Sequence, residues 1–268
     1  MKFKLYELLE QALLQSDAGL KCDMVKEIHC QWQQGNLQRE SGREVLPLDN
    51  PGMPDKPELV DPSKLARRSI GTEQGRITLL HAVAHIEFNA INIALDAAYR
   101  FQQMPDSYVG DWLLVASEEA LHFTLLKDEL EARNSYYGAF DAHRGLWDMV
   151  CKTRHDVLHR MALVPRVMEA RGLDVTPAMI KKFRKIGDES ACDILQRIYQ
   201  DEIGHVRIGN HWFQYLCEQR GIDLIAGFRS LIAEYLGEGL RGPFNWEARQ
   251  LAGFSRQELA SLEADIRR

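Results

Sequence analysis

The heptapeptide SEEALHF at residues 117–123 decides the interpretation of the fold, because it places Glu119 three residues before His122 in a long helical pattern. The same arrangement recurs in DEIGHV at residues 201–206, where Glu202 precedes His205 by three. Positions i and i+3 share a face of an α-helix, so each pair aims a carboxylate and an imidazole in one direction. One such pair is expected by chance in a chain of this length. Two pairs, each in an apolar stripe, indicate a shared chemical role.

Two further glutamates complete an internal repeat. Glu87 lies in an apolar stripe 32 residues before Glu119, and Glu169 lies 33 residues before Glu202. A helical bundle that binds two metal ions takes one Glu from each of two helices and a Glu-x-x-His from each of the other two. Burying a carboxylate without a partner is costly, which disfavours a purely structural role. The predicted metal ligands are Glu87, Glu119, His122, Glu169, Glu202 and His205.

The ligand from the third long helix remains open between two positions. The connection from Asn134 to Asp141 is short. If the third helix runs straight back along the second, the residue level with Glu119 lies near position 155, which nominates His155, Asp156 or His159 as the ligand. If residues 141–153 instead form a crossover, the repeat spacing favours Glu169, and His155 is the reserve.

Helical periodicity covers most of the chain, and alternating β-branched runs are scarce. The exception is the stretch of residues 41–64, whose five prolines predict an irregular wrapping loop. We therefore expect an all-α fold with a four-helix bundle over residues 72–220, N-terminal helices and the proline-rich loop over 1–71, and a helical extension packed on the bundle over 221–268. The expected helices cover residues 2–15, 20–34, 72–102, 107 or 111 to 134, 141–171, a short one from 176, 188–221 and 223–237, and a last one with Ser255 and Glu258 as its capping box.

Bulk composition excludes several classes of protein. The net charge of −6 argues against a general binder of nucleic acid or acidic membranes. Five cysteines without a Cys-x-x-Cys pair predict free thiols rather than a disulfide framework or a zinc or iron–sulfur knuckle. The first 15 residues lack the apolar core of a signal peptide, and no apolar run is expected to span a bilayer. These features predict a cytoplasmic protein.

Residues 72–220 resemble the ferritin-like di-iron superfamily. A closer resemblance, to an uncharacterised bacterial ferritin-like family, is carried by LLHAVAHIEFNAI (79–91), MEARGLDVTP (168–177), QDEIGHVRIGNHWF (200–213) and RGPFNWEARQLAGF (241–254). The resemblance implies a ferritin-like four-helix bundle with extra terminal helices, but no substrate. In di-iron enzymes of the superfamily an acidic residue just before the motif Glu often hydrogen-bonds a ligand histidine. Glu118 and Asp201 occupy that position here, so the resemblance predicts this role for them.

The expected cofactor is a pair of iron ions, with manganese as the alternative because the two metals accept similar ligands. The first functional hypothesis is an oxidase or hydroxylase that activates dioxygen or peroxide, takes electrons from an external donor and acts on an unknown small molecule. The alternative is an iron-handling or peroxide-detoxifying protein like ferritin or rubrerythrin. A monomer or small homo-oligomer would favour the enzyme, and a 12-mer or 24-mer would favour storage. No nucleic-acid or membrane partner is expected.

A second polar stripe on the first long helix, formed by His81, His85, Asn92 and Asp96, lies away from Glu87. We interpret it as structural, with its polar atoms hydrogen-bonded to neighbouring elements.

Overall fold

The computed structural model of the chain describes residues 3–40, 42–65, 70–237 and 239–266. Lys2, where the first helix was expected to begin, and Ser41, the first residue of the proline-rich stretch, lie outside the described residues. The all-α prediction is confirmed, because most of the described residues lie in helices. The strands in the described part of the chain are β1 and β2, which have two residues each. The chain divides into two compact units, residues 1–151 and residues 152–268.

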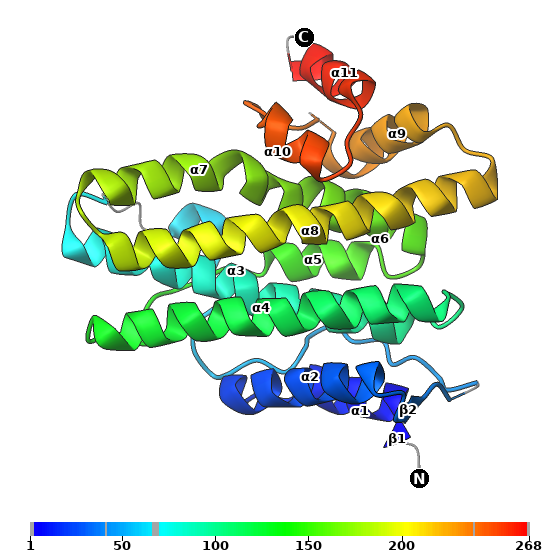
Figure 1. Cartoon of the computed structure of the whole chain (residues 1–268), viewed down its shortest axis with the longest axis horizontal. Helices are drawn as coiled ribbons and strands as arrows, with labels where there is room; N and C mark the ends of the chain where they lie inside the picture. Colours follow the sequence, from blue (N-terminus) through cyan, green and yellow to red (C-terminus); the bar gives the residue numbers. More distant parts are fainter. Residues whose placement is uncertain (1–2, 41, 66–69, 238, 267–268) are drawn as a thin grey trace. The chain divides into compact units, whose positions relative to one another are not determined.

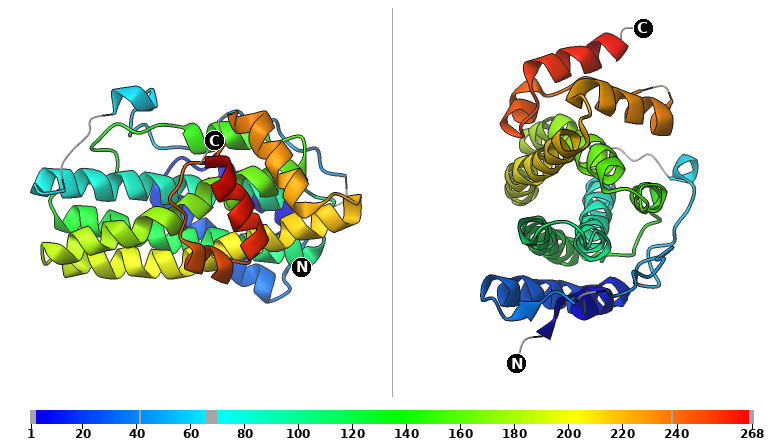
Figure 2. Two further views of the ribbon diagram at one scale, coloured as in Figure 1. Left: turned by 90° about the horizontal axis from the view of Figure 1, so that it is seen from above. Right: turned by 90° about the vertical axis from the view of Figure 1, so that its right-hand side faces the viewer.

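Unit 1 is built on a pair of long helices, α3 and α4, which lie side by side (Figure 1). The N-terminal helices α1 and α2 pack against this pair, α1 on α3 and α2 on α4 (Figure 2). Over its described residues, 42–64, the proline-rich stretch is irregular apart from one short 3-10 turn, η1, and an isolated β-bridge of Leu59 with Ala142, as its prolines require. The elements are β1 (Phe3–Lys4), α1 (Leu5–Leu14), α2 (Ala18–Gln33), β2 (Leu37–Gln38), η1 (Pro62–Lys64), α3 (Glu73–Arg100), α4 (Asp106–Ala132) and α5 (Gly145–Lys152), whose last residue belongs to unit 2.

Unit 2 is built on α7 and α8, which pack along each other and are joined by a three-residue turn. The preceding helix α6 and a π-helical segment, η2, also pack on α8. Helices α9 and α10 contact these elements (Figure 2). The expected capping box is present at α11, where Ser255 and Glu258 exchange backbone-to-side-chain hydrogen bonds of 2.8 and 3.2 Å. The bounds are α6 (Val157–Leu163), η2 (Val164–Glu169), α7 (Ala170–Lys185), α8 (Glu189–Arg220), α9 (Leu224–Leu236), α10 (Trp246–Leu251) and α11 (Arg256–Ile266).

The third long helix differs from the prediction of one helix over residues 141–171. It is divided into α5, α6 and η2–α7, because Asp156 caps the start of α6 by accepting from Leu158 N at 2.7 Å. The helix also continues through Gly172 and Pro177 instead of ending and restarting there. Pro177 removes one helical hydrogen bond, but the buried face that includes Leu173 and Ile180 offsets this cost by packing.

Helix α3 is the most buried long helix of unit 1. It is also long and apolar enough to meet a minimal criterion for crossing a membrane, with a mean hydropathy of 1.2 over 18 residues. Of that window, 78% is buried inside the protein. The criterion is therefore weak evidence for a membrane span, since a core helix has the same composition.

A buried lysine ties three parts of unit 1 together. Lys21 of α2 is 0% exposed, and its ammonium donates to Leu13 O at 3.3 Å, to Gly52 O at 2.9 Å and to Asn92 Oδ1. These acceptors belong to α1, to the proline-rich stretch and to α3. All three are neutral oxygens, so burial prevails and lowers the pKa of Lys21 to about 7.

In unit 2, the backbone of α8 at Gly209 approaches Pro165 of η2 closely. A Cβ added at Gly209 would lie 2.3 Å from Cβ of Pro165, a distance that no side chain can occupy. Only glycine therefore allows the two segments to approach this closely.

We expect Lys21→Met to lower the free energy of unfolding by about 2 kcal/mol or more, because buried oxygens lose their donor. Between pH 7 and 10.5 the unfolded chain binds a proton at Lys21 that the folded chain has lost, so the stability difference between the wild type and Lys21→Met should rise with pH in that window. Urea unfolding of the two proteins across this range tests both statements. Lys26→Met, an exposed position on the same helix, is the control and should change neither quantity. An unchanged midpoint for Lys21→Met would contradict the assignment.

We expect Gly209→Ala to destabilise the protein by about 1–3 kcal/mol, because the new methyl group forces α8 away from Pro165. Gly204→Ala, five residues earlier on the same helix, meets nothing within 4 Å and should be neutral or stabilising by up to about 1 kcal/mol. Thermal unfolding of the pair makes the comparison. Equal effects of the two substitutions would show that the close contact does not exist.

Candidate metal centre

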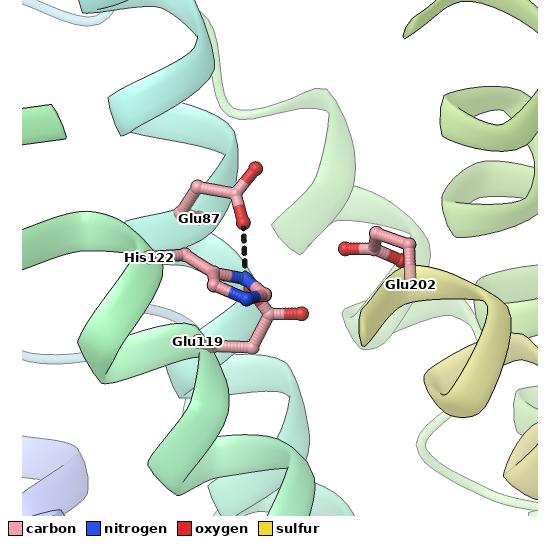
Figure 3. Close-up of side chains that lie close together, drawn as sticks. All are labelled: Glu87, Glu119, His122 and Glu202. Carbon is pink, nitrogen blue, oxygen red and sulfur yellow. Dashed lines mark hydrogen bonds and ion pairs between the residues drawn. The ribbon is translucent and has the colours of Figure 1, made fainter. Parts of the chain in front are cut away.

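Two helices of unit 1 bring three of the predicted ligands together. Glu87 projects from α3, and Glu119 and His122 project from α4 on one face, as their spacing predicts. The three side chains point toward one another (Figure 3), and they offer ligand atoms within 4.8 Å of one another. This group of buried Glu and His residues could hold a metal ion.

The atoms of this group are arranged around one imidazole nitrogen. His122 Nδ1 lies 3.2 Å from Glu87 Oε2 and 3.3 Å from Glu119 Oε2. Glu87 is 3% exposed, and Glu119 and His122 are 0% exposed. Burial first, and the charge of Glu119 second, raise the pKa of Glu87 well above its usual range, while His122 acts in the opposite direction. A bound cation would remove this cost, because it would interact with both carboxylates at once.

The second Glu-x-x-His pair lies on α8 in unit 2. Glu202 and His205 again share a helix face, with His205 Nδ1 3.7 Å from Glu202 Oε1. His205 is buried, and the Glu202 side chain is 12% exposed. Figure 3 also draws Glu202. The spacing of three residues thus places Glu202 and His205 on one face of α8, as the sequence predicts.

The contact of Pro165 with Gly209 sets the register between η2–α7 and α8. The two helical segments run antiparallel, because only a short turn joins α7 to α8. Glu169 is four residues after Pro165, and His205 is four residues before Gly209, so Glu169 lies level with His205. Both carboxylate oxygens of Glu169 are buried.

The reserve ligand His155 lies elsewhere in unit 2. Its neighbour Asp156 forms an ion pair of 2.7 Å with Arg220 at the end of α8. Arg220 is 15 residues beyond His205, roughly 22 Å along the helix at 1.5 Å per residue. His155 therefore lies far from the Glu202–His205 pair of its own unit, and the register favours Glu169.

Asp201 and Glu118, which directly precede the motif glutamates, interact with residues other than the proposed ligands. Asp201 Oδ2 accepts from Arg197 Nε at 2.5 Å, one turn earlier on α8. Glu118 is half-buried, and its charge acts to raise the pKa of His29, although burial lowers that pKa overall. Their predicted hydrogen bonds to ligand histidines stay predictions.

The histidines of the polar stripe on α3 hold the connection between α4 and α5. Because the carbonyl of His143 lies 3.0 Å from His85 Nε2, that nitrogen carries the proton, and Nδ1 accepts from the Tyr137 hydroxyl at 2.9 Å. His81 Nε2 accepts from the Gly138 amide at 2.9 Å. Burial lowers the pKa of both histidines to about 4, which keeps them neutral. These contacts agree with the structural interpretation.

Sequence reasoning missed the π-helical segment and two buried arginines, Arg166 and Arg249. The available signal was a proline, Pro165, in the middle of an apolar helical run, together with a charged residue directly after it.

For the metal-free protein, we expect Glu87→Gln to raise the free energy of unfolding at pH 8. The folded pKa of Glu87 lies above the usual value of 4.5, so the folded state holds a proton that the unfolded state has lost, and the contribution of Glu87 to wild-type stability falls as pH rises above 4.5. The variant should lack this fall. Urea unfolding in the presence of a chelator measures it. Glu129→Gln is the control, since the Glu129 carboxylate pairs with Arg133 at 2.8 Å. A loss of stability in Glu87→Gln would refute the explanation.

Comparison with known proteins gives a family but no activity. A family model described as "Protein of unknown function (DUF455)" matches residues 14–260. An uncharacterised protein of Haemophilus influenzae is 43% identical over 264 residues, which cover 95% of this chain and 92% of the relative. No solved structure matches the chain. The chain therefore belongs to the DUF455 family of proteins of unknown function.

Proposed function

We propose that this protein binds two metal ions, iron or manganese, through two Glu and two Glu-x-x-His ligand sets. The observation that carries the proposal is the buried group of Glu87, Glu119 and His122, in which two carboxylates and one imidazole nitrogen converge. The second set, on unit 2, has the same composition, two glutamates and one histidine. In it Glu169 lies level with His205 across the contact of η2–α7 with α8. The repeat in the sequence thus corresponds, in each unit, to a Glu-x-x-His pair on one helix face.

The donor atoms suit iron or manganese. Carboxylate and imidazole ligands favour these ions, and the proposed six ligands include no thiolate. Four glutamates would balance the charge of two divalent ions. The raised pKa of Glu87 supports this reasoning, because the protein tolerates adjacent buried carboxylates that a cation would stabilise. We infer that the four ligand-bearing segments, α3, α4, η2–α7 and α8, make up a ferritin-like four-helix bundle.

The proposed activity is that of an oxidase or hydroxylase acting on a small molecule. Bound iron would supply the redox chemistry and the activation of dioxygen, and an external donor would supply electrons. The residues of the chain would bind the ions and keep water away. Glu87, Glu119 and His122 are already buried to 3% exposure or less, so their environment favours tight interaction with a cation.

Metal content per chain tests the proposal directly. We expect about two iron or manganese ions per wild-type chain by elemental analysis, on protein purified without a histidine tag. Glu119→Gln and Glu202→Gln should each lose most of the bound metal while far-UV circular dichroism stays unchanged, because each variant removes one anionic ligand. Glu129→Gln on the same helix as Glu119 should retain full content, since Glu129 is paired with Arg133.

Full metal content in both ligand variants would overturn the assignment. Uptake of many more than two ions per chain would instead favour the iron-handling alternative. Consumption of dioxygen by the ferrous protein without accumulation of stored iron would favour the enzyme.

A further inference from the structure

The segment η2 departs from regular α-helical geometry just before Glu169. The Ala170 amide donates to Pro165 O, five residues back, which is the π-helical pattern. One extra residue per turn changes the direction of the side chains that follow. Glu169 is the last residue of this segment, so its direction depends on whether the π turn is maintained.

A buried arginine in the middle of η2 links it to the C-terminal helix α11. Arg166 is 1% exposed, and its Nη2 donates to Glu258 Oε1 at 2.5 Å. Three phenyl rings enclose the guanidinium: those of Phe213, Phe228 and Phe254, with centroids 4.4, 4.1 and 4.7 Å away. Since Glu258 Oε2 accepts from the Ser255 amide, the carboxylate is itself held in place by the capping box of α11.

A second buried arginine, from α10, holds the other end of the π turn. Arg249 Nε and Nη2 donate to the two carboxylate oxygens of Asp174 at 2.9 and 2.8 Å. Its Nη2 also lies 3.3 Å from Ala170 O, the carbonyl that follows Glu169. Glu169 therefore lies between two arginine contacts made by the C-terminal helices, one on each side along the chain.

Energetics indicate that these pairs contribute geometry rather than stability. A buried ion pair seldom stabilises a protein more than apolar residues of the same size, because both charges lose their hydration. Arg166 Nε also has no hydrogen-bond acceptor in the part of the chain that the structure describes. The two guanidinium groups instead fix the direction of the backbone near them. Arg249 does so through two hydrogen bonds to one carboxylate, and Arg166 through its position between three phenyl rings.

We propose that Arg166 with Glu258, and Arg249 with Asp174, are positioning residues through which helices α10 and α11 maintain the π turn and orient Glu169 for metal binding. The metal-binding part rests on the proposed function, in which Glu169 is a ligand. The C-terminal extension is then part of the metal site's architecture, although none of its residues is a ligand.

The experiment uses the full chain with both charges of the first pair removed, Arg166→Met with Glu258→Gln. Gln retains an oxygen for the Ser255 amide, and Met retains much of the volume between the phenyl rings. Because apolar replacement of a buried pair is usually tolerated, we expect the fold to survive. Amide hydrogen exchange of the metal-free protein should become at least about tenfold faster for residues 167–170 alone. Titration with Co²⁺ should show one of the two ions bound at least about tenfold more weakly.

Two further variants keep the test decisive. Trp246→Phe removes the 2.6 Å hydrogen bond that joins Trp246 of α10 to Glu263 of α11 and leaves both arginine pairs intact. It should alter neither exchange at 167–170 nor Co²⁺ affinity. If the first double variant does not fold, Arg249→Met with Asp174→Asn takes its place, since Asn retains an acceptor for the Asn245 amide.

Unchanged exchange at residues 167–170 would overturn the proposal, and so would faster exchange with both ions bound at wild-type affinity. A wild-type chain that binds no Co²⁺ would refute the proposed function and, with it, the role of Glu169 in metal binding. The exchange measurement separates the two failures, because it reports on the π turn without any metal.

Discussion

Two carboxylates buried beside one histidine are the constraint on which the rest of this structure depends. Glu87 and Glu119 approach the same nitrogen of His122 inside the core of unit 1, where water cannot solvate their charges. Such an arrangement costs free energy of folding, because the buried carboxylates lose their hydration and repel each other, which also raises the pKa of Glu87. A protein that maintains it must gain stability elsewhere, and α3 and α4 do so by burying long apolar faces against each other and against α1 and α2.

The two units solve the problem of holding buried polar groups in different ways. Unit 1 holds its helices together with an ammonium, Lys21, bonded to three neutral oxygens from three segments. Unit 2 uses guanidinium groups paired with carboxylates and enclosed by aromatic rings. In both units a buried basic side chain fixes the geometry of a ligand-bearing helix, and apolar packing supplies the stability. Buried polar networks of this kind specify one arrangement because any other leaves a charge without its partners.

Much of the helical architecture could be predicted from the sequence. Glu119 with His122, and Glu202 with His205, lie on shared helix faces because i, i+3 spacing is a local property of any α-helix. The capping box at Ser255 was predictable for the same reason, since both of its hydrogen bonds are local. The prolines of residues 41–64 excluded regular structure before any fold was known, because proline lacks the backbone donor.

Only the tertiary structure decided how the third long helix is divided and which of its residues lies level with His205. Local rules predicted an end at Gly172 and a restart at Pro177, but packing of α7 on α8 maintains the helix through both. The π turn of η2 and the close approach of Pro165 to Gly209 set the level of Glu169. These features depend on contacts between residues far apart in the sequence, such as Pro165 with Gly209, 44 positions apart, and Arg166 with Glu258, 92 positions apart. The sequence by itself determined which residues could be ligands, because spacing is local; tertiary packing determined where Glu169 lies, because register is not.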